Sequence, residues 1–258
     1  MKKHFVLIHG LCHGAWCWYK VKPMLEAEGH RVTALDLSAS GINTKKIEEI
    51  QTMAEYSEPL TDLMKSIPPE EKVILVGHSL GGLSLGVAME EFPHKISTAI
   101  FVTAFMPDSS HPPSYVLDQL FEKIPAEAWL DTQFSSSDNS GKPAPSVLIG
   151  PKDLSRFYHL CSPQDFSLGM MLMRRGSVFL EDLSKAKAFS NERYGSVKRI
   201  YIVIKEDQII TEKFQRWMIE NNPVQQVKEI DGADHMAMFS NPEDLCRCLL
   251  EIANDASP

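Results

Sequence analysis

The stretch VGHSLGG at residues 76–82 sets Ser79 between Gly77 and Gly81. The apolar run KVILVG that leads into it predicts a buried strand, and the segment LGGLSLGVAMEEF that follows predicts a helix ending before a proline. Between a strand and a helix the serine must occupy a strained turn, and glycines must flank it because larger side chains would meet neighbouring backbone. The motif therefore predicts a turn that presents the Ser79 hydroxyl as a nucleophile.

Short apolar and β-branched runs recur along the rest of the chain and predict further strands, at 4–9, 31–37, 96–102, 199–204 and 226–230. Continuous apolar runs of this length are typical of strands that are buried on both faces, as in a parallel sheet. Helical patterns lie between them, at 15–29, 53–67 and 80–92. The alternation predicts an α/β fold with a mostly parallel central sheet flanked by helices.

The alternation of strands and helices stops between residues 106 and 187. This segment contains eight prolines, the polar stretch SSSDNSGKPAPS and two helical patterns. A departure of this length with periodic segments of its own predicts an inserted, mainly helical cap rather than a loop. The core then comprises 1–105 and 188–258. The cap contains a run of methionines, Met170, Met171 and Met173, that could line an adaptable pocket, although core packing is the commoner use of such a run.

Composition excludes several classes of protein. The chain has 258 residues and a formal net charge of −8, and its basic residues form no run longer than a pair, which argues against nucleic-acid binding. No apolar stretch reaches the roughly 18 residues that indicate a membrane helix. The five cysteines follow no disulfide or metal-ligand spacing, so we expect a reducing, cytoplasmic location. Cys246 and Cys248 lie two apart in a helical pattern and do not share a face, which favours packing over a metal site.

A nucleophilic serine needs a base to take its proton and an acid to orient that base. In a sheet of this kind the acid and the histidine follow the serine in the chain, each after a strand at the carboxyl edge. Asp207 lies just beyond the strand at 199–204, and His235 lies in the loop DGADHMAMF, ahead of the last helical pattern. We therefore predict Ser79, Asp207 and His235 as a catalytic triad.

Other acids compete for the role assigned to Asp207. Glu206 is adjacent to it, and the later position in the strand-end loop favours Asp207. Asp231 and Asp234 are too close to His235 in the sequence to be obvious orienting partners, so we interpret them as loop and turn residues.

Acyl transfer also needs two backbone N–H groups that hold the developing oxyanion. The residue after the nucleophile, Leu80, is one candidate. The loop after the first strand, HGLCHGAW, offers Leu11 behind His9 and Gly10.

These motifs recur together in one known family. HFVLIHGLCHGAWCWYKVKPMLEAEGHRVTALDLSASGI, EKVILVGHSLGG, FMPDS, EDLSKAKAFSNERYGSVKRIYIV and GADHMAMFSNPEDLC resemble the plant methylesterase and hydroxynitrile lyase family of α/β-hydrolases, over essentially the whole chain. The resemblance implies the α/β-hydrolase fold and the same triad and oxyanion-hole residues. It implies no cofactor and no metal, a small-molecule ester as substrate, and a homodimer, since family members are often dimers.

The family includes two chemistries, hydrolysis of small methyl esters and cleavage of cyanohydrins. The lyases that it contains carry a threonine or an asparagine where this chain has Gly10, and one type carries a lysine where it has Met236. A lysine ammonium stabilises a leaving cyanide, which methionine cannot do. His78, before the nucleophile, also matches the esterases. The three positions favour a methylesterase that acts on plant hormone or specialised-metabolite esters.

By the same resemblance the acyl group lies under the cap, with Phe105, Trp129 and Phe134 as candidate wall residues beside Gly10, His78 and Met236, although aromatic residues are more often core than pocket. Two other functions stay open. One is lyase or other carbon–carbon cleavage on the same triad. The other is a hormone receptor on a hydrolase scaffold, which the intact triad disfavours.

Overall fold

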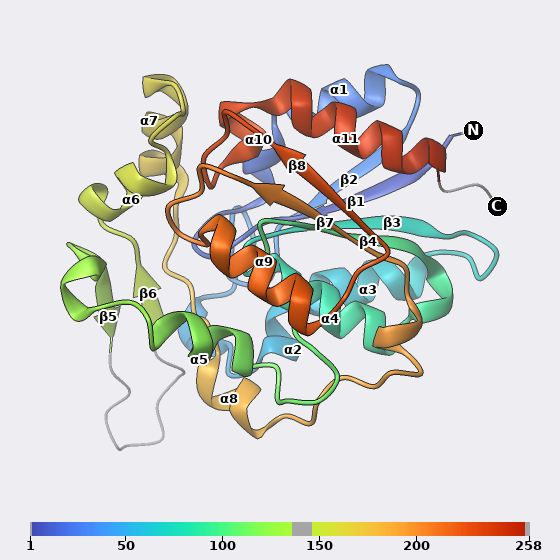
Figure 1. Ribbon diagram of the computed structural model, residues 1–258, viewed down its shortest axis with the longest axis horizontal. Helices are drawn as coiled ribbons and strands as arrows, with labels where there is room; N and C mark the ends of the chain where they lie inside the picture. The colour runs from blue at the N-terminus through green and yellow to red at the C-terminus, as the bar shows by residue number, and fades with distance from the viewer. Residues whose placement is uncertain (1, 136–145, 256–258) are drawn as a thin grey trace.

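A six-stranded sheet forms the centre of the molecule in the computed structural model, which describes residues 2–135 and 146–255 (Figure 1). All neighbouring strands in it are parallel, in the order β2-β1-β3-β4-β7-β8. The strands are β1 (His4–Ile8), β2 (Arg31–Leu35), β3 (Val73–His78), β4 (Ile96–Val102), β7 (Arg199–Ile204) and β8 (Gln226–Ile230). Each corresponds to a predicted apolar run, so the predicted α/β fold is confirmed.

Helices cover both faces of this sheet (Figure 1). One face carries α1 (Val21–Ala27), α10 (Ala237–Ser240) and α11 (Pro242–Asp255), and the other carries α2 (Met53–Tyr56), α3 (Glu58–Ser66), α4 (Gly81–Glu91) and α9 (Glu212–Asn221). Each face has its own apolar core. Along β1, Phe5 and Leu7 belong to the core under α1 and α11, while Val6 and Ile8 belong to the core under α2, α3 and α4. Burial on both sides explains why the strands are continuously apolar.

Two of the predicted helices are interrupted. The segment 15–29 forms a 3₁₀ turn, η1 (Ala15–Trp18), followed by α1, and the segment 53–67 forms α2 and then α3. Each interruption precedes a proline, Pro23 or Pro59, that lies in the first turn of the next helix. Proline has no N–H to bond to the preceding turn, so a new helix begins there.

The segment 106–187, between β4 and β7, lies beside the carboxyl ends of the strands (Figure 1). Its elements are α5 (Tyr115–Phe121), η4 (Ala126–Trp129), β5 (Gln133–Ser135), β6 (Ser146–Leu148), α6 (Pro151–Phe157), α7 (Pro163–Leu172) and α8 (Leu180–Lys185). It is mainly helical, but β5 and β6 pair antiparallel, which the sequence did not suggest. Residues 136–145, including two of the eight prolines, lie outside the described residues. We keep the name cap for 106–187, whose bounds stay a prediction.

The methionine run of the cap lines no part of the cavity described below, and only Met173 packs against the core. The side chains of Met170 and Met171 are 39% and 72% exposed, and Met173 is partly buried against the core. Met170 and Met171 therefore meet solvent, and the pocket interpretation of this run is wrong.

Several features of the described residues bear on compartment and cofactors. All five cysteines are free, and Cys246 and Cys248 are both buried in α11. Within residues 2–135 and 146–255, no group of three or more metal-ligating side chains has metal-site geometry. In the same residues, no helix has the length and apolar character needed to cross a membrane.

Candidate active site

The turn between β3 and α4 has the strain that the motif predicts. Ser79 has a φ of +53°, in the left-handed region that few residues other than glycine adopt. A Cβ added to Gly77 would lie 2.7 Å from a methyl carbon of Leu85, and one added to Gly81 would lie 2.6 Å from the carbonyl oxygen of His9. The backbone contact excludes a larger residue at Gly81, whereas at Gly77 the Leu85 side chain would have to move to admit one.

His235 and Asp207 come from loops after neighbouring strands, β8 and β7, and meet at the carboxyl edge. The Nδ1 atom of His235 lies 2.7 Å from Oδ2 of Asp207, and both side chains are almost fully buried. A carboxylate accepts, so Nδ1 carries the hydrogen and Nε2 keeps its lone pair. Within the described residues the His235 ring makes no hydrogen bond to Ser79, and its Nε2 is left available as a base.

The Asp207 carboxylate is fixed by further donors. Oδ1 accepts hydrogen bonds from the backbone N–H groups of Ile209 (2.7 Å) and Ile210 (3.0 Å), and Oδ2 also accepts one from Oγ1 of Thr103 (2.5 Å). With the His235 bond, four donors face two oxygens, about the full capacity of a carboxylate. The carboxylate is therefore held in one orientation toward His235.

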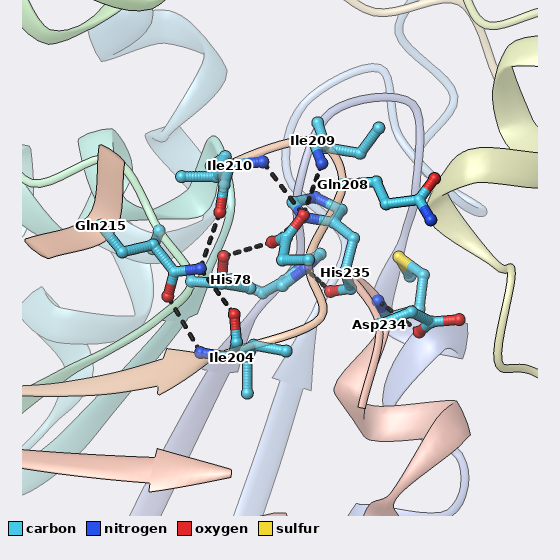
Figure 2. A network of polar contacts seen from close by, with 12 residues as sticks. His78, Ile204, Gln208, Ile209, Ile210, Gln215, Asp234 and His235 are labelled. Atoms are coloured by element: carbon cyan, nitrogen blue, oxygen red, sulfur yellow. Dashed lines mark hydrogen bonds and ion pairs between the residues drawn. The ribbon is translucent and has the colours of Figure 1, made fainter. Parts of the chain in front are cut away.

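Gln215 on α9 holds the loop that carries Asp207 (Figure 2). Its side-chain oxygen accepts from the N–H of Ile204 (3.0 Å), and its amide nitrogen donates to the carbonyls of Ile204 (2.9 Å) and Ile210 (2.7 Å). The residue is fully buried. One side chain thus joins the end of β7 to the far end of the loop. The sequence analysis missed this residue because a single glutamine in a helix carries no local signal for such a role.

The competing acids lie elsewhere. Glu206 is exposed, and its carboxylate accepts a long hydrogen bond from the N–H of Ala233 (3.4 Å). Asp231 forms an exposed ion pair with Lys205 (2.8 Å). The acid that contacts His235 is Asp207.

Asp234 does more than the turn role we assigned to it. It is fully buried, and it accepts hydrogen bonds from the N–H groups of Met236 (3.0 Å) and Leu160 (2.7 Å). The first closes a turn around His235, as expected, and the second reaches the cap. The carboxylate therefore ties the His235 loop to the segment between α6 and α7.

His78 lies behind His235. Its Nε2 donates to the backbone carbonyl of His235 (2.8 Å), and the two rings are 4.6 Å apart. Burial, with the positive charge that His235 carries when protonated, holds the pKa of His78 well below its usual value. The neutral ring has its hydrogen on Nε2, while the buried Nδ1 has no hydrogen-bond partner in the described residues.

The two predicted oxyanion-hole residues, Leu11 and Leu80, both border the same cavity as Ser79. Within the described residues neither backbone N–H donates to a carbonyl of a loop or turn. The Gly10–Leu11 peptide group is fixed through its carbonyl. The carbonyl oxygen of Gly10 accepts a hydrogen bond from Nδ1 of His9 (2.8 Å), and this orients the Leu11 N–H. Nε2 of His9 accepts from the N–H of Leu37 (3.1 Å), and burial lowers the pKa of this ring, which favours the neutral form.

A second histidine fixes the next peptide of the same loop. Nδ1 of His13 donates to the carbonyl of Leu11 (2.8 Å), so Nε2 accepts from the Tyr158 hydroxyl of the cap (2.7 Å). The His13 ring also stacks between Trp16 and Tyr158. Burial lowers the pKa of His13 to about 3. Two neutral histidines thus hold the loop that carries Leu11, one from the core and one through the cap.

A cavity of about 390 Å³ opens over Ser79 between the core and the cap. Apart from Ser79 and Glu181, every described residue that lines it is apolar. Trp129 contributes to the wall and packs edge-on against Phe121 and Phe134, and Phe157 packs edge-on against the ring of His235. Such a cavity accommodates an uncharged, largely apolar molecule.

The predicted pocket residues divide into two groups. Phe105, Trp129 and Phe134 line this cavity, although Phe134 is also 54% exposed. Gly10, His78 and Met236 do not line it, and the last two are almost fully buried. A Cβ on Gly10 would lie 2.8 Å from Cβ of Ser79, so this glycine gives the serine its space. Phe157 and Ile209 are wall residues that the sequence analysis missed.

Comparison with known proteins settles the family. Residues 5–247 match the model of the alpha/beta hydrolase family. The chain belongs to the alpha/beta hydrolase family. Within this family it is 58% identical to salicylic acid-binding protein 2 of Nicotiana tabacum over 253 residues, which are 98% of this chain and 97% of that protein.

Two further members of the alpha/beta hydrolase family are similar along the whole chain. Methylesterase 1 of Arabidopsis thaliana is 56% identical over 257 residues, with 98% of this chain and 97% of that protein covered. The crystal structure of polyneuridine aldehyde esterase superposes with a TM-score of 0.95 at 52% identity, and 98% of this chain and 100% of that chain are covered. The resemblance to plant methylesterases is therefore confirmed.

Proposed function

We propose that this chain is a serine carboxylesterase that hydrolyses small methyl esters through Ser79, His235 and Asp207. The observation that carries the proposal is the buried pair of His235 and Asp207 beside a strained serine on the wall of an apolar cavity. Its esterase relatives, at more than 50% identity, support the same activity.

The reaction begins when Oγ of Ser79 attacks the ester carbonyl carbon while Nε2 of His235 takes the hydroxyl proton. The Asp207 carboxylate stabilises the imidazolium through Nδ1. The N–H groups of Leu11 and Leu80 hold the negative charge that develops on the carbonyl oxygen.

The carbon–methoxy bond then breaks, and His235 returns the proton to the departing oxygen, which leaves as methanol. A water molecule that gives its proton to the same ring attacks the acyl-enzyme. When the bond to Ser79 breaks, the free acid is released and Oγ regains its proton. No cofactor is required, since each step transfers only a proton or an acyl group.

The cavity supports an acyl portion that is uncharged and largely apolar. Burying a charge in such a wall without a partner is costly, whereas a neutral ester loses little on leaving water. A volume of about 390 Å³ suits an acid of one or two rings or a short chain. Plant hormone and specialised-metabolite esters are of this class.

Hydrolysis is favoured over cyanohydrin cleavage by two positions. The described residues around the site include no cation that would stabilise a cyanide leaving group, and the residue after His235 is the buried Met236. At Gly10 a threonine side chain would press on Ser79, since even a Cβ would lie 2.8 Å from it. Mandelonitrile tests this directly, and release of cyanide above the buffer rate would favour the lyase.

A panel of methyl esters of aromatic and aliphatic acids, compared by kcat/KM, tests the assignment. Ser79→Ala is expected to lower kcat by at least about 10³-fold, because no other group on the cavity wall can form the acyl-enzyme. Ser84→Ala, a buried serine on the following helix, is the matched control. Ester turnover that survives Ser79→Ala would overturn the proposed function.

We also propose a cytoplasmic location and a homodimer. The five free cysteines support a reducing compartment, since oxidising compartments favour pairing. Sedimentation equilibrium of the purified chain tests the dimer, which a mass of one subunit at micromolar concentration would contradict.

A further inference from the structure

A second cavity, of about 420 Å³, lies between the cap and α9. Its apolar wall includes Leu120, Phe214 and Trp217, and the charged groups on it are Lys123, Arg156 and Lys213. None of the described residues that line it is acidic. We call this cavity the basic groove.

The basic groove adjoins the catalytic cavity, because Leu120, Ile124 and Ile209 line both. The charges on the two walls differ. Glu181 at the catalytic cavity is paired with Lys185 (2.6 Å) and Arg156 at the groove is paired with Asp153 (3.0 Å), which leaves Lys123 and Lys213 as the unpaired charges of the groove among the described residues. An anion is therefore attracted to the groove.

The two lysines are free to bind an anion. Within the described residues neither Lys123 nor Lys213 forms an ion pair, and both are exposed. Nζ of Lys123 lies over the rings of Phe214 (5.4 Å) and Trp217 (5.2 Å), which holds the ammonium at the apolar wall. An aromatic surface beside cations suits a molecule that has both a ring and a negative charge.

Arg156 forms the fixed part of the wall. It pairs with Asp153 (3.0 Å) and donates to the carbonyls of Ala128 (2.9 Å) and Gln208 (3.2 Å). Gln208 follows Asp207, and Ile209, which lines the groove, donates its N–H to the Asp207 carboxylate (2.7 Å). A ligand in the groove therefore contacts the loop that holds the catalytic acid.

We propose that the basic groove binds the apolar carboxylate that ester hydrolysis produces. The inference rests on the proposed function, in which a neutral ester enters and a carboxylate anion leaves. The carboxylate pairs with Lys123 and Lys213, and its apolar portion covers Phe214 and Trp217. The groove then draws the product away from the catalytic cavity, and at high concentration the bound product slows turnover without competing fully with the ester.

Calorimetric titration of the whole chain with 2-naphthoate tests the groove without any turnover. We expect Lys123→Ala/Lys213→Ala to weaken one class of binding site by at least about tenfold, a loss of about 1.4 kcal/mol. The control is Lys72→Ala, an exposed lysine in the loop before β3, which is expected to bind as the unsubstituted protein does. The uncharged 2-naphthylmethanol should show no dependence on the two lysines.

Two results would overturn the proposal that the basic groove binds the carboxylate product. One is 2-naphthoate binding by the double variant with the same stoichiometry and Kd as in the Lys72→Ala control. The other is an equal loss of 2-naphthylmethanol binding in the double variant, which would mean that the lysines shape the wall without recognising charge. Failure of the proposed function is distinguishable, because it would appear as absent ester turnover whatever the titrations show.

Discussion

Replacing Asp207 with asparagine tests the proposed roles of the triad through the hydrogen-bond pattern of the carboxylate. Oδ1 accepts from two backbone N–H groups, Ile209 and Ile210, which cannot turn away. An asparagine must therefore place its oxygen there and its NH2 group at the position of Oδ2, facing His235. The Thr103 hydroxyl, which also faces Oδ2, can rotate and accept from the new NH2 group.

His235 has no such freedom. To accept from the NH2 group, Nδ1 must lose its hydrogen, and the neutral ring then carries its hydrogen on Nε2. That ring cannot take the proton from Ser79, and no carboxylate remains to stabilise the imidazolium. We expect Asp207→Asn to lower kcat by about 10⁴-fold, or about 5.5 kcal/mol in activation free energy. The stability cost is smaller, about 2 kcal/mol, because the backbone donors keep an acceptor.

The assay is kcat on a methyl ester that the panel shows to be turned over, with urea unfolding to measure the free energy of folding. The low-field NMR signal of the Nδ1 hydrogen of His235 should be present in the unsubstituted protein and absent in the variant. Glu206→Gln is the matched control, since it makes the same chemical change at the adjacent exposed acid, and it should keep kcat within about twofold. An Asp207→Asn protein that is folded and retains a tenth of the original kcat would refute the reasoning.

Two other substitutions and a change of pH should alter kcat or the free energy of unfolding by measurable amounts. Gly10→Thr should lower kcat by at least about 10²-fold and destabilise the fold by about 2 kcal/mol, because its Cβ would press on Ser79; normal kcat in a folded variant would contradict this. Gln215→Met should cost about 3 kcal/mol in urea unfolding and lower kcat as well, while the exposed Gln51→Met should do neither; unchanged kcat would mean that Gln215 does not position the Asp207 loop. The free energy of unfolding should be highest above pH 6.5 and fall toward pH 3, because unfolded His13 takes a proton below pH 6.5 that the folded protein, with a pKa of about 3, refuses. His13 alone contributes about 2 kcal/mol of this loss at pH 5, and equal unfolding energies at pH 8 and pH 5 would exclude it.

The sheet and the Ser79 turn could be predicted because their causes are local. A strand buried on both faces must be apolar throughout, and a serine with a φ of +53° needs small neighbours whatever surrounds it. Asp207 and His235 could be proposed because parallel strands bring their carboxyl ends to one edge. The breaks before Pro23 and Pro59 were also encoded locally, since proline lacks an N–H, and a stricter use of that rule would have found them.

Other parts of the site depend on contacts between distant segments and have no local pattern. Gln215 is separated from Ile204 by eleven positions and lies on a helix that the sequence analysis did not assign. Phe157 packs on His235 from the cap, and nothing in its own segment distinguishes it from a core residue. Only Thr103 among these residues could have been found from the sequence. It is a polar residue directly after a central strand, at the edge where the acid and the histidine meet.

The cap is joined to the loops that carry His235 and Leu11, so its position is coupled to the geometry of the proposed catalytic groups. Asp234 accepts from the cap residue Leu160 and lies next to His235, while the cap residue Tyr158 donates to His13, which holds the loop at Leu11. Tyr158 and Leu160 are two residues apart, so one short segment of the cap contacts the loops that carry His235 and Leu11 together. A shift of that segment must strain or break one of these buried hydrogen bonds, each costly to leave unmade. The cap therefore cannot act as an independent lid over a rigid core, because moving it changes the geometry of the proposed catalytic groups.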